Sequence, residues 1–323
     1  MGGPDVHPNP CPHGPRRPAW LIEDWRPDLI VQEEGEYAGP VAGVQEGIPW
    51  VIHAWGSTLR PVEALVSLEE HTEGLWSSVG LDVMPWSGLY RYGLLNPCPA
   101  ILQRHAPGAL VVWPVTAGLA HDRSGTDRAD MADAYVGVGT VPLFADDYDV
   151  LAIAARSCTA RGLRTIVTTT SNEIAARLSD EGGGRVLGRT FVSLPAVLQK
   201  CRVVVCHGGA GTVLTALERG IPMVIVSKGS PSQVRMVEAC ANAGVAAVGG
   251  TDADSIGTAV NLVLDTPTYR QSAGVAAAHL PSLHGQPRRI KPIPTQWIPA
   301  ERPIARKPCR RVHDRTISPN CRL

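Results

Sequence analysis

The stretch CRVVVCHGGAGTVLTALERG, residues 201–220, decides the fold. It opens with a short apolar run at 202–206, passes through a glycine-rich turn, and continues as a helical pattern from near Thr212 to Arg219. A nearly continuous apolar run is typical of a strand that is covered on both faces, as in a parallel sheet. A buried strand that leads through glycines into a helix therefore predicts a Rossmann-like α/β unit, with its ligand-binding edge at the carboxyl end of the strand.

The same alternation extends in both directions from this stretch. Because strands that alternate with helices indicate a parallel sheet, we expect one Rossmann-like domain over residues 132–283. The expected strands are 134–139, 164–170, 185–188, 202–206, 222–226 and 244–248, and the main expected helices are 149–160, 194–200, 212–219, 233–243, 255–264 and 268–279.

A second, shorter alternation lies in the N-terminal part. A strand at 28–31, a helix at 37–45 and a strand at 49–55 form a βαβ pattern, and residues 60–80 have helical periodicity. This pattern predicts a further parallel sheet in an N-terminal lobe over residues 20–120.

Three segments lack such patterns. The polar residues 121–131 are the expected linker between the lobes. The proline-rich residues 1–19 and the basic residues 284–323 hold too few periodic apolar positions to form a core, so we expect both to be disordered.

The net charge of zero is an average of unlike parts. Residues 285–323 hold ten Lys or Arg and two Asp or Glu, a surplus of +8, so the preceding residues carry −8. The overall balance argues against wholesale nucleic-acid binding. The tail itself leaves two interpretations open: solvated disorder, or an arm for nucleic acid or a membrane surface.

Other bulk features exclude further classes. No apolar run approaches the roughly 20 residues that cross a bilayer, and the first residues show no apolar signal-peptide core. The eight cysteines are scattered, without the paired Cys-x-x-Cys spacing of a zinc site. We therefore expect a cytoplasmic protein with no integral membrane segment, no nucleic-acid partner and no metal.

The glycine turn after residue 206 predicts an anion site. Glycines let a backbone approach a ligand, and the first N–H groups of a helix attract phosphate. A dinucleotide fingerprint is disfavoured because Leu214 stands where its third glycine belongs, and the Lys-Ser/Thr of a Walker A loop is absent. A ligand-free structural turn remains an alternative, but His207 places an imidazole beside the glycines and favours the anion site.

The motif HGGAGT, the helix end ALERGIP and the strand PMVIV resemble the donor-binding signature of the GT-B nucleotide-sugar glycosyltransferases. Within that group the chain is similar to the bacterial branch that glycosylates macrolides and other natural products. The similarity extends over about residues 24–283, including 25–56, 135–141 and 191–209. It implies an α/β fold of two Rossmann-like lobes with parallel sheets, of which the N-terminal lobe is incomplete because the family's first strand and its turn have no counterpart.

The resemblance also implies roles for individual residues. In the family the corresponding positions bind the donor diphosphate, the nucleobase and the sugar. Here these are Gly139, Thr140, His207, Gly211 and Thr212 for the diphosphate, Phe191 and Val192 for the nucleobase, and Ser232 and Gln233 for the sugar.

Two departures from the family pattern concern the sugar. The family has an acidic residue before the glutamine, where this chain has Ser232. Met236 replaces a usual asparagine shortly after it. Both put sugar recognition in doubt.

By resemblance the chain is an enzyme that transfers a hexose or deoxyhexose from a nucleotide-diphosphate sugar to a natural-product hydroxyl, with inversion and without metal or cofactor. Its partners are the nucleotide sugar and a small-molecule acceptor. The family's catalytic histidine loop has no counterpart here. Glu33, after the strand at 28–31, is the remaining catalytic candidate, and a solvated acidic turn is its alternative interpretation. The alternative function is a non-catalytic nucleotide-sugar-binding or auxiliary paralogue. A dinucleotide oxidoreductase is disfavoured by Leu214.

Overall fold

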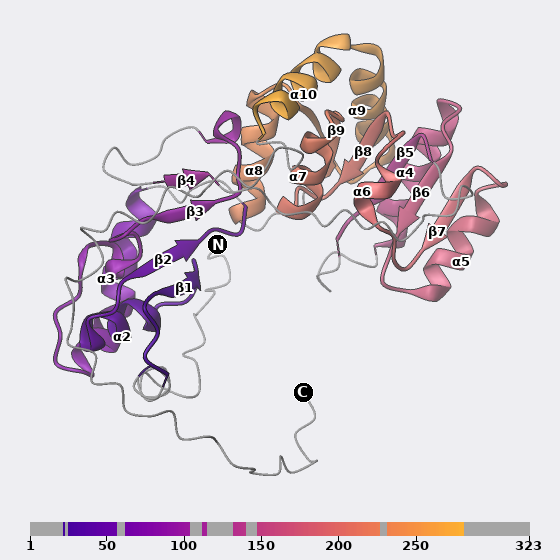
Figure 1. The fold of residues 1–323 in the computed structure, drawn as a ribbon. Coiled ribbons are helices and arrows are strands. Elements are labelled where there is room, and N and C mark those ends of the chain that lie inside the picture. The colour runs from indigo at the N-terminus through magenta and orange to yellow at the C-terminus, as the bar shows by residue number, and fades with distance from the viewer. Residues whose placement is uncertain are drawn as a thin grey trace, which may run out of the picture. The chain divides into compact units, whose positions relative to one another are not determined.

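The structure is a computed structural model that describes residues 22, 25–56, 62–103, 112–114, 132–139, 147–226 and 231–280. The chain divides into two compact units, residues 1–288 and residues 289–323. All described residues belong to the first unit, which contains two separate parallel sheets (Figure 1). The expected linker at 121–131 and both expected disordered ends lie outside the described residues, so these boundaries stay predictions.

The N-terminal sheet has four parallel strands in the order β1-β2-β3-β4. They are β1 (Ile30–Glu33), β2 (Trp50–His53), β3 (Leu94–Asn96) and β4 (Val112–Pro114). Helix α2 (Ala38–Glu46) connects β1 to β2, and α3 (Val62–Ser77) with the short turns η1 (Pro85–Gly88) and η2 (Ala100–Leu102) completes the described part. The predicted βαβ unit is confirmed.

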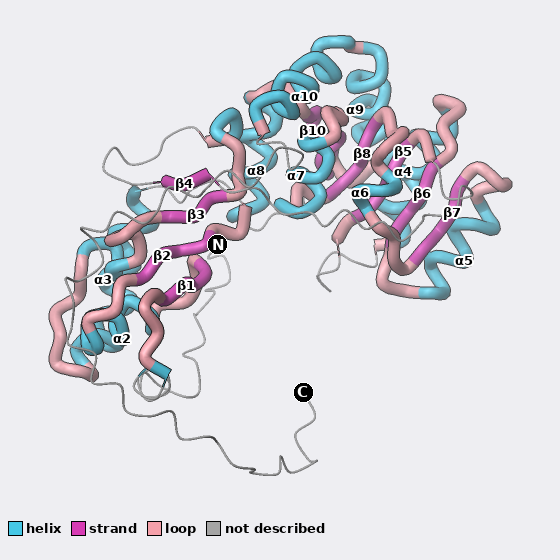
Figure 2. The backbone as a smooth tube through the Cα atoms, viewed as in Figure 1, coloured by secondary structure: helices cyan, strands magenta, loops and turns pink. Residues whose placement is uncertain are grey.

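The C-terminal sheet has six parallel strands in the order β10-β9-β8-β5-β6-β7 (Figure 2). Its strands are β5 (Ala134–Gly137), β6 (Thr165–Thr168), β7 (Val186–Arg189), β8 (Val203–Cys206), β9 (Met223–Val226) and β10 (Ala246–Gly249). Its helices are α4 (Tyr148–Ala160), α5 (Asn172–Glu181), α6 (Leu194–Val197), α7 (Ala210–Glu218), α8 (Pro231–Asn242), α9 (Ala253–Asp265) and α10 (Pro267–His279).

The strand order reverses between β5 and β8. From β5 the chain builds outward through β6 to β7, and it then returns to the other side of β5 to add β8, β9 and β10. In open α/β sheets this switch point leaves a crevice at the carboxyl ends of the two central strands, where ligands bind. The topology thus points to the segments that follow Gly137 and Cys206.

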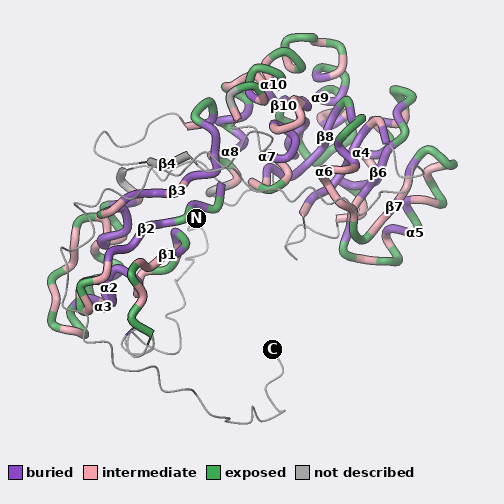
Figure 3. The backbone as a smooth tube through the Cα atoms, viewed as in Figure 1, coloured by how far each residue is buried: buried purple, intermediate pink, exposed green. Residues whose placement is uncertain are grey.

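Both faces of this sheet are covered, as the apolar runs predicted (Figure 3). Successive residues of a strand point to opposite faces. Accordingly Val204 belongs to one buried cluster, with residues of α7 and α8, whereas Val203 and Val205 belong to a second cluster with residues of α4 and α9.

The sequence placed several element ends imprecisely. It put the first strand at 28–31, but β1 begins at Ile30, because the register that pairs it with β2 runs from Ile30 opposite Trp50 to Glu33 opposite His53. It began the central helix near Thr212, but α7 begins at Ala210, with Gly209 in extended conformation as its N-cap. Strands β3 and β4 were not predicted, because each is only three residues long and a proline stands at or directly after its end.

Within the described part of the chain, no helix combines the length and apolar character that crossing a bilayer requires.

Candidate functional site

The candidate site lies at the switch point of the C-terminal sheet. Strands β5 and β8 pair in parallel, with Gly137 opposite Cys206, so the turns after both strands leave the sheet at the same edge. The turn after β5 reaches Gly139, and the turn after β8 begins with His207. Two residues that are 68 positions apart in the sequence are thereby brought together.

The His207 ring is held between two glycines. A Cβ atom at Gly139 would lie 2.5 Å from His207 Cε1, and a Cβ atom at Gly209 would lie 2.4 Å from His207 Nε2. Both distances are too short for a real side chain, and Gly139 also has a φ of +88°, which non-glycine residues rarely adopt. Glycine is therefore required on both sides of the imidazole.

Burial makes this imidazole predominantly neutral. His207 is only 9% exposed. Burial lowers the pKa of His207 below its ordinary value, and a hydrogen bond with the Gly137 backbone opposes part of that shift. The neutral ring has a single N–H, which the bond to the Gly137 backbone uses. An anion bound beside the ring favours its protonated form, whose second N–H is free to donate to that anion.

The N-terminus of α7 follows the histidine directly. Its N-cap, Gly209, has no side chain to cap the first N–H groups, and its first turn holds no acidic residue. Gly211 is exposed and a Cβ atom there would meet nothing within 4 Å, while Thr212 is half-buried in the same turn. Unsatisfied N–H groups, the positive end of the helix dipole and open space together form an anion-binding terminus.

A hydrogen-bonded pair of hydroxyls, from the buried Tyr135 and the half-buried Thr168, lies beneath this edge, and the sequence did not predict it. Tyr135 Oη and Thr168 Oγ1 are 2.6 Å apart, and burial raises the pKa of Tyr135 to about 12. A Cβ atom at Gly137 would lie 2.4 Å from Tyr135 Oη and 2.7 Å from Thr168 Oγ1, so the pair packs directly against the backbone that leads to Gly139. A tyrosine within an otherwise small and aliphatic strand was the available signal.

The predicted nucleobase residues follow β7 on the same carboxyl edge of the sheet. Phe191 is 83% exposed, whereas Val192 is half-buried and packs against the core. The aromatic side chain of Phe191 is therefore available at the rim.

The predicted sugar residues lie in the first turn of α8. Gln233 is half-buried there, and the side chain of Ser232 is outside the described part, as is the whole of Thr140. Met236 is 1% exposed and belongs to the core. In this chain position 236 is a packing position, and its effect on sugar recognition stays a prediction.

The catalytic candidate Glu33 lies on the other sheet, at the end of β1. Its carboxylate Oε2 accepts a hydrogen bond of 2.7 Å from the backbone N–H of Gly35. This bond closes a local exposed turn, which is the structural alternative that the sequence left open. The next residue, Glu34, is buried.

Two sequence models of one family match the chain. The model described as erythromycin biosynthesis protein CIII-like, N-terminal domain, matches residues 19–71, and the corresponding C-terminal domain matches residues 165–287. Both domains are thus matched in their order along the chain. This chain belongs to the bacterial natural-product glycosyltransferases.

Curated relatives of this glycosyltransferase-family chain agree with that assignment. Erythronolide mycarosyltransferase of Saccharopolyspora erythraea is 27% identical over 286 residues, covering 78% of this chain and 65% of the relative. Elloramycin glycosyltransferase ElmGT of Streptomyces olivaceus is 27% identical over 274 residues, covering 81% of this chain and 66% of the relative. The chain therefore spans just under two thirds of the length of these relatives.

Solved structures show the fold. The glycotransferase of kitacinnamycin has a TM-score of 0.69 at 18% identity, covering 82% of this chain and 75% of that one. Spinosyn rhamnosyltransferase SpnG complexed with thymidine diphosphate has a TM-score of 0.66 at 22% identity, covering 82% and 72%. These neighbours have the GT-B fold, which confirms the predicted fold class.

Proposed function

We propose that the chain binds a nucleotide-diphosphate sugar at the switch point of its C-terminal sheet and serves the transfer of a hexose or deoxyhexose to a natural-product hydroxyl. The observation that carries the proposal is the His207 ring, fixed between Gly139 and Gly209 beside the uncapped N-terminus of α7. A diphosphate fits this edge because it presents several oxyanions to an N–H donor and to a helix N-terminus at once.

In the proposed reaction the acceptor hydroxyl oxygen attacks the anomeric carbon of the sugar. The bond from that carbon to the diphosphate oxygen breaks, and the nucleotide diphosphate leaves with the electron pair while a base takes the hydroxyl proton. A single displacement of this kind inverts the anomeric centre. His207 and the first N–H groups of α7 stabilise the charge that grows on the departing diphosphate, so these groups supply the role that a metal ion has elsewhere.

Names of the relatives support a deoxysugar donor. Relatives include 3-alpha-mycarosylerythronolide B desosaminyl transferase and tylactone mycaminosyltransferase, and the structural neighbour VinC was solved in complex with dTDP. We therefore propose dTDP- or UDP-sugars as the donor class.

The diphosphate role is tested by calorimetry with dTDP and UDP. We expect His207→Ala to weaken binding about 10- to 150-fold, since a hydrogen bond to a charged group contributes about 1.5–3 kcal/mol. His71→Ala is the matched control, because His71 is an exposed histidine on α3 that bonds only its own helix backbone. Unchanged affinity of His207→Ala would contradict the proposal.

A non-catalytic nucleotide-sugar-binding paralogue is the second candidate. It is favoured by Ser232, which stands where the family has an acid. Incubation with nucleotide sugars and acceptors separates the two functions: released nucleotide diphosphate supports the transferase, and binding without release supports the paralogue.

A further inference from the structure

The carboxyl ends of β8, β5 and β6 form one row, in which paired residues lie side by side. Cys206 lies opposite Gly137, and Gly137 lies opposite Thr168. On the face of the sheet that α7 covers, Tyr135 reaches along β5 to the end of this row, where its Oη contacts Thr168 Oγ1. Because Gly137 has no side chain, the two hydroxyls occupy the space that a Cβ atom at position 137 would take. The row therefore leads from the turn that holds His207 to a pair of hydroxyls.

The hydroxyls of Tyr135 and Thr168 share one hydrogen bond but hold two protons. Tyr135 Oη, 2.6 Å away, is the hydrogen-bond partner of Thr168 Oγ1 within the described part of the chain. Tyr135 is buried, and its raised pKa of about 12 keeps the phenol protonated at neutral pH, whereas Thr168 is half-buried. When the buried phenol donates to Thr168 Oγ1, the proton of the more exposed Thr168 hydroxyl is left for a ligand at this edge.

The strand order indicates which part of a nucleotide passes over Thr168. The diphosphate site lies at the turns after β8 and β5, and the predicted nucleobase residue Phe191 follows β7. Strand β6 lies between β5 and β7. Since neighbouring strands are about 4.8 Å apart, a ligand that reaches from β5 to β7 crosses about 10 Å over the end of β6. The pentose joins the diphosphate to the base, so it is the part that lies over Thr168.

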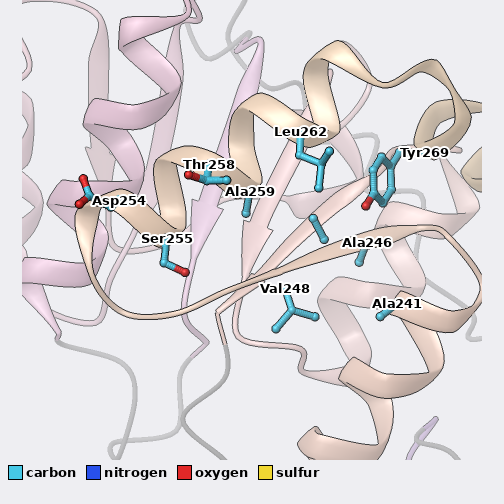
Figure 4. Close-up of a pocket in the computed structure, with 10 residues that line it drawn as sticks. Ala241, Ala246, Val248, Asp254, Ser255, Thr258, Ala259, Leu262 and Tyr269 are labelled. Carbon is cyan, nitrogen blue, oxygen red and sulfur yellow. The ribbon is translucent and has the colours of Figure 1, made fainter.

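The other side of the switch point suits a nucleoside less well. A groove of about 450 Å³ runs beside β10 on that side, and Figure 4 shows Asp254 and Tyr269 at its opposite ends. Asp254 is exposed in the first turn of α9, directly after the carboxyl end of β10. The groove thus presents a carboxylate, which repels an anionic ligand, toward the diphosphate edge, and its aromatic ring lies at the far end. The nucleoside is therefore assigned to the β7 side.

We propose that Thr168 binds the nucleotide by donating a hydrogen bond to a pentose oxygen, and that Tyr135 is the positioning residue that orients the Thr168 hydroxyl. The proposal rests on the proposed function, because the diphosphate site places the pentose. Tyr135 itself belongs to the buried core and acts only through Thr168. The acceptor is an oxygen that ribose and deoxyribose share, so the contact serves UDP and dTDP alike.

Calorimetry of the full chain with dTDP and with inorganic pyrophosphate tests the contact, because pyrophosphate has the diphosphate but no pentose. We expect Thr168→Val to weaken dTDP binding about 2- to 12-fold, the loss of one hydrogen bond between uncharged groups, and to leave pyrophosphate binding unchanged. Thr168→Ser keeps the hydroxyl and should retain most of the dTDP affinity. Thr159→Val is the matched control, because Thr159 is also half-buried but bonds the Arg156 carbonyl of its own helix.

Unchanged dTDP affinity in Thr168→Val would overturn the proposal, and so would an equal loss for pyrophosphate, which would mean that the hydroxyls act only on the diphosphate turn. The proposed function fails separately, since it requires His207→Ala to weaken dTDP and pyrophosphate alike, whatever Thr168→Val does.

A double-mutant cycle tests the positioning role of Tyr135. Tyr135→Phe alone should weaken dTDP binding by up to as much as Thr168→Val, because it frees the Thr168 hydroxyl to rotate. In the Thr168→Val background the same change should cause no further loss of dTDP affinity, since no hydroxyl remains to be oriented. A merely structural effect on the sheet would add to the loss, and that additive result would overturn the role assigned to Tyr135.

Discussion

Alanine at Gly139 tests whether the glycine is required by the His207 ring. The backbone at Gly139 has a φ of +88°, and an alanine Cβ would lie 2.5 Å from His207 Cε1 and 2.9 Å from His207 Nε2. The positive φ costs an alanine about 1–2 kcal/mol of folding free energy. The contact cannot be relieved by a flexible side-chain end, so the imidazole must leave its position between Gly139 and Gly209.

Displacement of the ring removes its hydrogen bond to the donor diphosphate. A bond to a charged group contributes about 1.5–3 kcal/mol, so the affinity for dTDP should fall about 10- to 150-fold. Calorimetry measures the affinity, and urea unfolding measures the stability of the same variant. The two readouts separate backbone strain from loss of the ligand contact.

Gly162→Ala is the matched control for this variant. Gly162 has a φ of +75°, yet a Cβ atom there would meet nothing within 4 Å. It should therefore lose a similar amount of stability and no dTDP affinity. Normal dTDP binding by Gly139→Ala, or an equal loss by Gly162→Ala, would refute the reasoning. In the His207→Ala background the Gly139→Ala effect on binding should disappear, because the ring that clashes is gone.

Two further outcomes follow from the same edge of the sheet. Tyr135→Phe leaves Thr168 Oγ1 without its partner 2.6 Å away, so unfolding free energy should fall by about 1–2 kcal/mol in urea titrations, with Tyr269→Phe, a half-buried tyrosine, as comparison. The pKa of His207 is lower in the folded than in the unfolded chain, so below the ordinary histidine pKa the unfolded chain binds more protons. The free energy of unfolding therefore decreases as the pH falls through and below that value. The stability difference between neutral pH and about pH 5 should shrink in His207→Gln, and an unchanged difference would contradict the assigned pKa direction.

The sequence was informative wherever one local pattern sufficed. The strand–glycine–helix stretch at 201–220 predicted the parallel sheet, the ligand edge and His207, because strand period, glycine chemistry and helix start are all local signals. The prediction missed β3 and β4, since strands of only three residues have no period to detect. Element ends were displaced by about two residues where pairing or capping, rather than propensity, determines the boundary.

Contacts between segments that lie far apart in the sequence could not be predicted from local patterns. The Tyr135–Thr168 pair joins residues 33 positions apart, and it became visible only when β5 and β6 were placed side by side. Burial is a second property that the sequence alone did not give. Met236, noted only as a departure from the family motif, is 1% exposed and belongs to the core, and its effect on sugar recognition stays a prediction.

The switch-point topology explains why the site depends on residues that no single motif contains. Because β5 is the first strand of its sheet and β8 is added to its free side only after β6 and β7, the two turns that hold His207 come from separate passes of the chain. Position 139, in the first turn, must be glycine because the His207 ring of the second turn occupies the space of a side chain. In turn, the first turn holds the His207 ring in place. The local motif HGGAG therefore predicts an anion site. The orientation of the His207 ring toward an anion depends in addition on the turn after β5, where any residue other than glycine would occupy the position of the ring.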